Sequence, residues 1–208
     1  MKKLGVGLAV AVGLLGIMLA GSASAAPRVQ ASNADDAVTL FAHDLAAFQA
    51  ALTADQLDAL VTASTNWRTM THLAQNDLLD RMDSDIQDIL TPAQYAQWVK
   101  LLSNAAIAGG GVYMPTLCVL SSRVSLIFSI IGVLGCPGDT SKDATADAYV
   151  AFSYAIICNM EGASSCPGAV DAAASSYITW TQLMGTCDLA DSAAATMGAT
   201  YVLCGGIY

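Results

Sequence analysis

The chain has 208 residues, 55% of them hydrophobic, and a formal net charge of −9 at pH 7. Sixteen of its seventeen acidic residues are aspartates. This negative balance disfavours nucleic acid and anionic lipid headgroups as partners, because an acidic surface repels phosphates. The length suits one domain, or two small halves that share a core.

The first 25 residues have the pattern of a secretory signal peptide. Lys2 and Lys3 precede a long uncharged apolar run, and the sequence ASA at Ala23 to Ala25 is typical of a cleavage site. A retained N-terminal anchor is the alternative interpretation. We expect cleavage after Ala25 and an exported protein, either periplasmic or extracellular.

Residues 26–108 read as an acidic helical segment with ten aspartates and no cysteine. Apolar residues recur at steps of three and four, which predicts helices and, with alternating patterns nearly absent, an all-α fold. Ser32 resembles a capping residue for the first helix. The second helix is expected from Thr53, the third over about 70–89 and the fourth from Thr91. The expected buried stripe of the first helix is Val38, Phe41, Leu45, Phe48 and Leu52.

Two stretches of this segment, LTADQLDAL from Leu52 and LTPAQYAQW from Leu90, share the pattern LTxxQ. Threonine at the N-cap and glutamine at N3 make a capping box, and the apolar residues at N′ and N4 make a hydrophobic staple. Pro92 falls at N1, where proline is favoured. The pattern is therefore explained as two helix starts, each stabilised by about 1 kcal/mol. The six positions concerned are Leu52, Thr53, Gln56, Leu90, Thr91 and Gln94.

The repeated pattern also resembles the LTxxQ motif of periplasmic stress proteins of the Spy/CpxP type, over residues 33–103. The resemblance places the same six residues at the motif positions. It implies a small, exported, all-helical protein that binds partly unfolded clients or damps an envelope stress sensor.

No group in the sequence has the pattern of a metal or catalytic site. The acidic run from Asp77 to Asp88 lacks the loop glycine and closing glutamate of a calcium-binding loop, so a solvated acidic helix face is the favoured interpretation. His43 and His72 have no second ligand at metal spacing. Hydrolase motifs are absent, and oxidised cysteines cannot supply a thiolate. We therefore expect no cofactor, no metal, no catalytic residue and no enzymatic activity.

Residues 109–208 begin within the break AGGG, at Ala108 to Gly111, and contain all six cysteines. The pattern predicts a bundle of four helices. DTSKD, at Asp139 to Asp143, is expected to cap the second of these helices. In the last helix a stripe of small residues predicts close packing against a neighbour: Ala190, Ala194, Gly198 and Val202. The expected helix ranges are 113–135, 144–159, 168–186 and 190–204.

The most apolar run after the signal is VSLIFSIIGVLG, from Val124 to Gly135. It has almost no polar side chains, which predicts burial on all sides, and it is too short to span a bilayer. The favoured interpretation is the central helix of a disulfide-stapled bundle. The alternative is a helix that a pore-forming protein turns outward onto a target membrane.

An even number of cysteines without a C-x-x-C motif, in an exported chain, predicts three disulfides. If neighbouring helices run antiparallel, Cys136 and Cys187 lie at one end of the bundle and the other four cysteines at the opposite end. A disulfide cannot reach from one end to the other, so Cys136 should pair with Cys187. We favour Cys158–Cys166 and Cys118–Cys204 for the rest, and the alternative is Cys118–Cys158 with Cys166–Cys204.

The sequence thus predicts an exported all-α protein with acidic N-terminal helices and a six-cysteine bundle. A non-enzymatic binding or envelope-stress role, with a protein or peptide partner, is the favoured function. The alternative is a secreted antimicrobial or pore-forming protein with an N-terminal pro- or immunity segment, and only that alternative involves a membrane.

Overall fold

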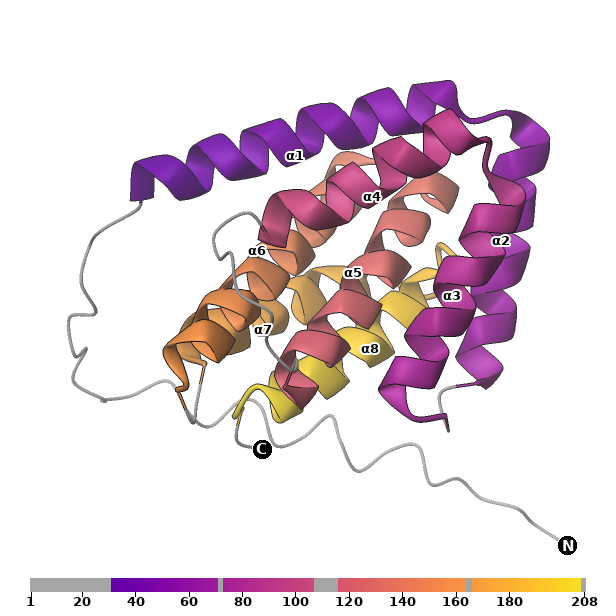
Figure 1. Cartoon of the computed structure of the whole chain (residues 1–208). Coiled ribbons are helices and arrows are strands. Elements are labelled where there is room, and N and C mark those ends of the chain that lie inside the picture. The colour runs from indigo at the N-terminus through magenta and orange to yellow at the C-terminus, as the bar shows by residue number, and fades with distance from the viewer. Residues whose placement is uncertain (1–30, 71–72, 107–115, 164–165, 207–208) are drawn as a thin grey trace, which may run out of the picture.

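The computed structural model describes residues 31–70, 73–106, 116–163 and 166–206. The expected signal peptide and the expected boundary between the two segments lie outside this range. Throughout the described ranges the regular structure is helical (Figure 1). The helices are α1 (Ala31–Ala51), α2 (Ala54–Thr69), α3 (Gln75–Ile89), α4 (Pro92–Ala106), α5 (Leu117–Gly135), α6 (Asp139–Glu161), α7 (Pro167–Gln182) and α8 (Ala190–Leu203).

The four C-terminal helices form a closed bundle in which each helix has two neighbours. Helix α5 packs against α6 and α8, and α7 packs against the same two helices. All residues of α5 from Val124 to Leu134 are buried, as its apolar sequence predicts, while Gly135 is exposed. Helix α5 is the one described helix that by itself is long and apolar enough to cross a membrane. Inside the molecule, 89% of its most apolar 18-residue stretch is buried.

The N-terminal helices cover one side of this bundle. The chain bends by 114° between α1 and α2, so that α1 extends along α4 and α6 while α2 and α3 pack against α5 (Figure 1). The hydroxyl group of Thr53 caps α2 in a complete capping box, which accounts for the sharp start of that helix.

The main hydrophobic core contains buried residues of both segments, and a second, small cluster lies within the bundle around Cys118, Cys166 and Cys204. The Phe41 ring of α1 stacks on the Tyr149 ring of α6, with ring centroids 4.3 Å apart. The Trp67 ring of α2 meets the Phe128 ring of α5 edge to face at 6.3 Å. Since aromatic pairs of this kind add to the free energy of burial, the N-terminal helices and the bundle stabilise each other.

Several helix ends differ from the sequence-based expectation. Helix α1 includes Ser32, which was expected to cap it, and α5 begins at Leu117 rather than at 113. Helix α3 begins at Gln75 rather than Met70, and α7 ends at Gln182 rather than at 186. Helix α6 begins at Asp139, so DTSKD forms its first turn and does not cap it; the N-cap position is Gly138, without a side-chain cap. The carboxylate of Asp139 is favourable there because it lies near the positive end of the helix dipole.

Candidate functional site

The two LTxxQ motifs lie against each other in the structure. The side-chain oxygen of Gln56 accepts from the backbone amide of Thr53 at 3.1 Å, and that of Gln94 accepts from the amide of Thr91 at 2.9 Å. Each glutamine also uses its side-chain nitrogen. Gln56 donates to the oxygen of Gln94 at 2.8 Å, and Gln94 donates to the oxygen of Gln56 at 2.9 Å.

Each glutamine also reaches the end of the other motif's preceding helix. The side-chain nitrogen of Gln94 donates to the carbonyl oxygen of Ala51, at the end of α1, at 2.7 Å. That of Gln56 donates to the carbonyl oxygen of Ile89, at the end of α3, at 3.2 Å. The pair therefore ties two helix–helix turns together in a nearly symmetric manner. Both side-chain amides are used within the fold, so the hydrogen bonds of the motif serve the structure directly.

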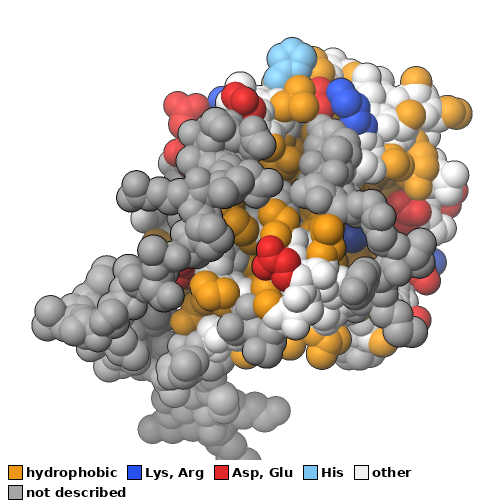
Figure 2. All heavy atoms as spheres, turned by 60° about the vertical axis from the view of Figure 1, so that its left-hand side comes forward, with side chains coloured by type: hydrophobic (Ala, Val, Ile, Leu, Met, Phe, Trp, Pro, Cys, Tyr) orange, Lys and Arg blue, Asp and Glu red, His pale blue; other side chains and the backbone are white. Residues whose placement is uncertain are grey.

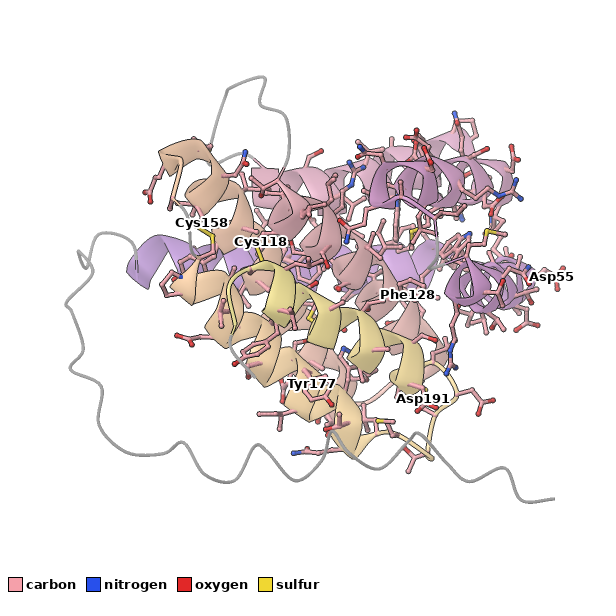
Figure 3. All side chains as sticks on the ribbon, turned by 90° about the horizontal axis from the view of Figure 1, so that it is seen from below. Asp55, Cys118, Phe128, Cys158, Tyr177 and Asp191 are labelled. Atoms are coloured by element: carbon pink, nitrogen blue, oxygen red, sulfur yellow. A yellow bond between two sulfur atoms is a disulfide. The ribbon has the colours of Figure 1, made fainter. Side chains whose placement is uncertain are left out.

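The six cysteines form the pairs Cys118–Cys204, Cys136–Cys187 and Cys158–Cys166. Their Cα atoms are 4.6, 6.0 and 5.8 Å apart. The antiparallel topology predicted Cys136–Cys187, and the other two pairs are the favoured choice rather than the alternative. Cys118 and Cys158 lie at the same end of the bundle, far from Asp55 at the start of α2 (Figure 3). Disulfides indicate that the protein forms in an oxidising compartment.

A groove lies at the other end of the bundle, beside Cys136–Cys187. It has a volume of about 770 Å³ and runs between α2, the end of α5, the start of α6 and the segment that joins α7 to α8. Its walls include the apolar side chains of Leu57, Val61 and Leu183. Asp58 and Asp188 are exposed in it, and no lysine or arginine lines it.

The groove floor is closed by tight packing. A Cβ atom on Gly135 would lie 2.8 Å from a methyl carbon of Leu189 and 3.5 Å from one of Val61. The N-terminal segment and the bundle thus meet directly below the groove. Because the Cys136–Cys187 disulfide joins the end of α5 to the segment before α8, this side of the groove is held covalently.

A second, smaller hollow of about 160 Å³ lies where α3, α4, α5 and α6 meet. Its lining residues are Asp83, Val99, Leu102, Ser103, Arg123 and Phe152. Beside it, the Tyr95 hydroxyl donates to the Asp83 carboxylate, with both oxygens 3.0 Å away. Burial, and then the bond to Asp83 and its charge, raise the pKa of Tyr95, while the positive charge of Arg123 opposes the rise. Tyr95 thus remains a neutral donor at neutral pH.

The acidic run of α3 is only partly a solvated face. Asp77, Asp80 and Asp88 are exposed, in keeping with the prediction. Asp85, in contrast, accepts from the indole nitrogen of Trp67 at 2.8 Å and from Arg81. Asp83 and Asp85 lie at opposite edges of the buried face of α3, because they are two residues apart on the helix, so Asp83 meets Tyr95 of α4 and Asp85 meets Trp67 of α2.

His43 is exposed, with its Nδ1 atom 3.7 Å from a carboxylate oxygen of Asp44, and His72 lies outside the described residues. Across the described ranges, no three His, Cys, Asp or Glu side chains lie close enough together to hold a metal ion. Figure 2 shows acidic side chains at several separate places among hydrophobic ones on one face of the molecule.

Comparisons with protein-family models, with curated proteins and with solved structures found no match to this chain. The geometry of the groove and of the hollow is therefore the ground for a functional assignment.

The sequence did not single out either of these two sites. Asp58, Asp188 and Arg123 are separated by many residues and belong to different helices or loops, so no local pattern connects them. Arg123 directly precedes the apolar run that begins at Val124, and nothing in that run connects it with Asp83 or Phe152.

Proposed function

We propose that this protein is an exported, non-catalytic binding protein that holds a segment of a partner polypeptide in the groove beside Cys136–Cys187. The observation that carries the proposal is the groove itself. Its volume of about 770 Å³ lies within the range of 300–1,000 Å³ typical of ligand sites. Its apolar walls suit apolar side chains of a partner.

The charge of the groove indicates the kind of segment. Asp58 and Asp188 supply the charges among its lining residues. A partner segment that carries lysine or arginine beside apolar residues complements this lining, and the net charge of −9 attracts it over a longer distance. An acidic segment is repelled on both counts.

The disulfides and the signal pattern support a role outside the cytosol. The three disulfides favour an oxidising environment, and the signal pattern of residues 1–25 favours export to the periplasm or beyond the cell. A client-binding or envelope-stress role, which the resemblance of the LTxxQ motifs implies, agrees with such a groove.

The test measures binding of short fluorescent peptides that alternate lysine with leucine or phenylalanine. We expect saturable binding by the oxidised protein. The double variant Asp58→Lys with Asp188→Lys should weaken it about tenfold or more, since each close charge contact is worth about 1 kcal/mol or more. Asp80→Lys, an exposed aspartate on α3 outside the groove, is the matched control and should weaken it much less.

The same proteins should be compared in the aggregation of a reduced client. Wild-type protein and the Asp80→Lys control should slow aggregation, and the double groove variant should not. If the wild-type protein neither binds the basic peptides nor slows aggregation, the binding proposal is wrong.

A secreted pore-forming protein is the second candidate, because α5 is apolar and long enough to cross a membrane. Two disulfides oppose its release: Cys118–Cys204 joins the start of α5 to the end of α8, and Cys136–Cys187 holds the other end. Dye leakage from vesicles separates the two candidates. The binding protein should cause none, whether oxidised or reduced, while leakage that increases on reduction would favour the pore former.

A further inference from the structure

We propose that the hollow between α3, α4, α5 and α6 is a binding site for a small organic monocarboxylate with a short apolar chain, which Arg123 holds. This site is separate from the groove. Arg123 precedes Gly135 by twelve residues on α5, which is about 18 Å along the helix.

Arg123 is the observation from which the proposal starts. Its Nε atom is buried and has no hydrogen-bond partner. Other basic side chains within the described ranges are engaged: Arg81 pairs with Asp85, Lys100 with Asp44 and Lys142 with Asp139, and Arg68 also has an interaction partner. Leaving a charged donor buried without an acceptor is unfavourable, so the site favours a ligand that supplies one.

Asp83 does not fill this role, although it lines the same hollow. Its carboxylate accepts from the Tyr95 hydroxyl through both oxygens. Asp83 and Arg123 both belong to the described part of the chain, and no ion pair within 4.0 Å joins them. The negative charge is thus held to one side, and the guanidinium faces the hollow without a carboxylate against it.

The lining fixes the chemical class of the ligand. A guanidinium binds a carboxylate through two parallel hydrogen bonds, from Nε and one Nη atom. Val99, Leu102 and Phe152 provide an apolar wall for a hydrocarbon chain, and Ser103 adds a hydroxyl group. The charge of Asp83 disfavours a second negative charge on the ligand, so the site favours a monocarboxylate over phosphate and dicarboxylates.

The size of the hollow limits the length of the chain. Its volume of about 160 Å³ is roughly tenfold the 10–15 Å³ that a cavity needs to hold one water molecule. A branched five-carbon acid such as isovalerate is of this size. A long-chain fatty acid is too large to be enclosed there.

The experiment titrates the intact, oxidised protein with isovalerate and follows the arginine Nε–H signals by NMR. We expect a saturable shift of the Arg123 signal, assigned by its loss in Arg123→Lys. The Nε–H of Arg81, which already donates to Asp85 at 3.0 Å, serves as the internal control and should not move. Isopentanol, which has the same chain without the charge, and inorganic phosphate should leave the Arg123 signal unchanged.

Variants test the same assignment by affinity. Arg123→Gln should weaken isovalerate binding about tenfold or more, because a hydrogen bond to a charged group is worth about 1.5–3 kcal/mol. Arg81→Gln should change it less than about twofold. Val99→Trp, at a position that is 41% exposed, keeps the arginine and fills the hollow, so it should also abolish binding.

Three results would overturn the proposal: no saturable shift of the Arg123 signal, equal binding of isopentanol, or unchanged affinity in folded Arg123→Gln and Val99→Trp. All three results concern isovalerate binding at Arg123 and are independent of peptide binding in the groove. Either proposal can therefore be wrong without affecting the other.

Discussion

Gln56 and Gln94 show how a few side chains fix the geometry of the N-terminal helices. Each side-chain oxygen closes a capping box, and each side-chain nitrogen bonds the partner glutamine and a carbonyl oxygen at the end of another helix, α3 for Gln56 and α1 for Gln94. The carbonyl groups of Ala51 and Ile89 belong to helix ends, which have no intrahelical partner of their own. A single glutamine thus provides a hydrogen-bond partner both for a backbone amide at the start of one helix and for a carbonyl oxygen at the end of another.

Removal of this pair should reveal coupling between the two motifs. We expect Gln56→Ala and Gln94→Ala each to lower the free energy of unfolding by about 1–2 kcal/mol, through the lost cap and the unpaired carbonyl group. The double variant should lose less than the sum, with a coupling of about 0.5–1.5 kcal/mol. Urea denaturation measures all three, with the exposed Gln97→Ala as control. Additive losses would show that the two motifs act independently.

Asp147 is a carboxylate whose environment opposes its charge. Burial is the main cause that raises its pKa, the charge of Asp143 adds to the rise, and the hydrogen bond from Ser175 at 2.6 Å opposes it. A raised pKa in the folded state means that folding favours the protonated form. The contribution of this group to stability is therefore present below its unfolded pKa and lost as pH rises through the folded pKa.

We accordingly expect Asp147→Asn to raise the melting temperature near pH 7 and to have little effect near pH 3, where the wild-type carboxyl is already protonated. The asparagine side-chain oxygen still accepts from Ser175. Thermal unfolding of both proteins at a series of pH values measures the difference. Asp171→Asn, at an exposed site on α7, is the control and should change the melting temperature less. A melting temperature lowered at pH 7 would contradict the assigned sign.

At the scale of elements, α5 is a buried helix that still contains polar side chains. The hydroxyl groups of Ser121 and Ser125 both bond Thr200 of α8, at 2.9 and 2.8 Å. Ser129 accepts from the indole nitrogen of Trp180 on α7 at 3.1 Å. Since buried hydroxyl groups are costly without partners, these bonds fix which helix lies on which side of α5.

Two glycines test how closely the helices approach each other. A Cβ atom on Gly132 of α5 would lie 2.7 Å from the ring of Trp180, which is fully buried and cannot move aside. On Gly198 of α8 it would lie 3.5 Å from the ring of Tyr177, an ordinary contact. Tyr177 lies on α7, along the side that faces α8 (Figure 3).

We therefore expect Gly132→Ala to lower the free energy of unfolding by about 1–3 kcal/mol through overpacking. Gly198→Ala should raise it by up to about 1 kcal/mol, because alanine is the better helix former. Chemical denaturation of both variants measures this difference in sign. Equal effects in the two would mean that α5 and α7 are not in close contact at Gly132.

At the scale of the whole molecule, the disulfides and the shared core hold the eight described helices as one body. Cys118–Cys204 and Cys136–Cys187 close chain segments with sequence separations of 86 and 51, while Cys158–Cys166 closes one of 8. The loss of unfolded-state entropy increases with the length of the closed segment. The two long-range disulfides should therefore contribute more to stability than the short one.

Paired Cys→Ala variants should follow this order. We expect a loss of about 4–5 kcal/mol for either long-range disulfide and about 2.5 kcal/mol for Cys158–Cys166. Thermal unfolding of the three variants under oxidising conditions gives the ranking. The largest loss in the Cys158–Cys166 variant would indicate that local packing, rather than chain entropy, dominates its contribution.

The sequence by itself determined the helical fold, the starts of α2 and α4, the burial of α5 and the end of the bundle at which each cysteine lies. These features depend on spacing along one helix, on capping side chains, or on helix length compared with the reach of a disulfide. Only the tertiary structure decided that Gln56 meets Gln94, that Phe41 stacks on Tyr149, and that Asp58 and Asp188 line one groove. Contacts of this kind join residues that are distant in the chain, and helix periodicity says which face of a helix is buried but not which neighbour covers it. The unpaired Nε of Arg123 belongs with them, because whether a buried charge has a partner depends on every helix packed around it.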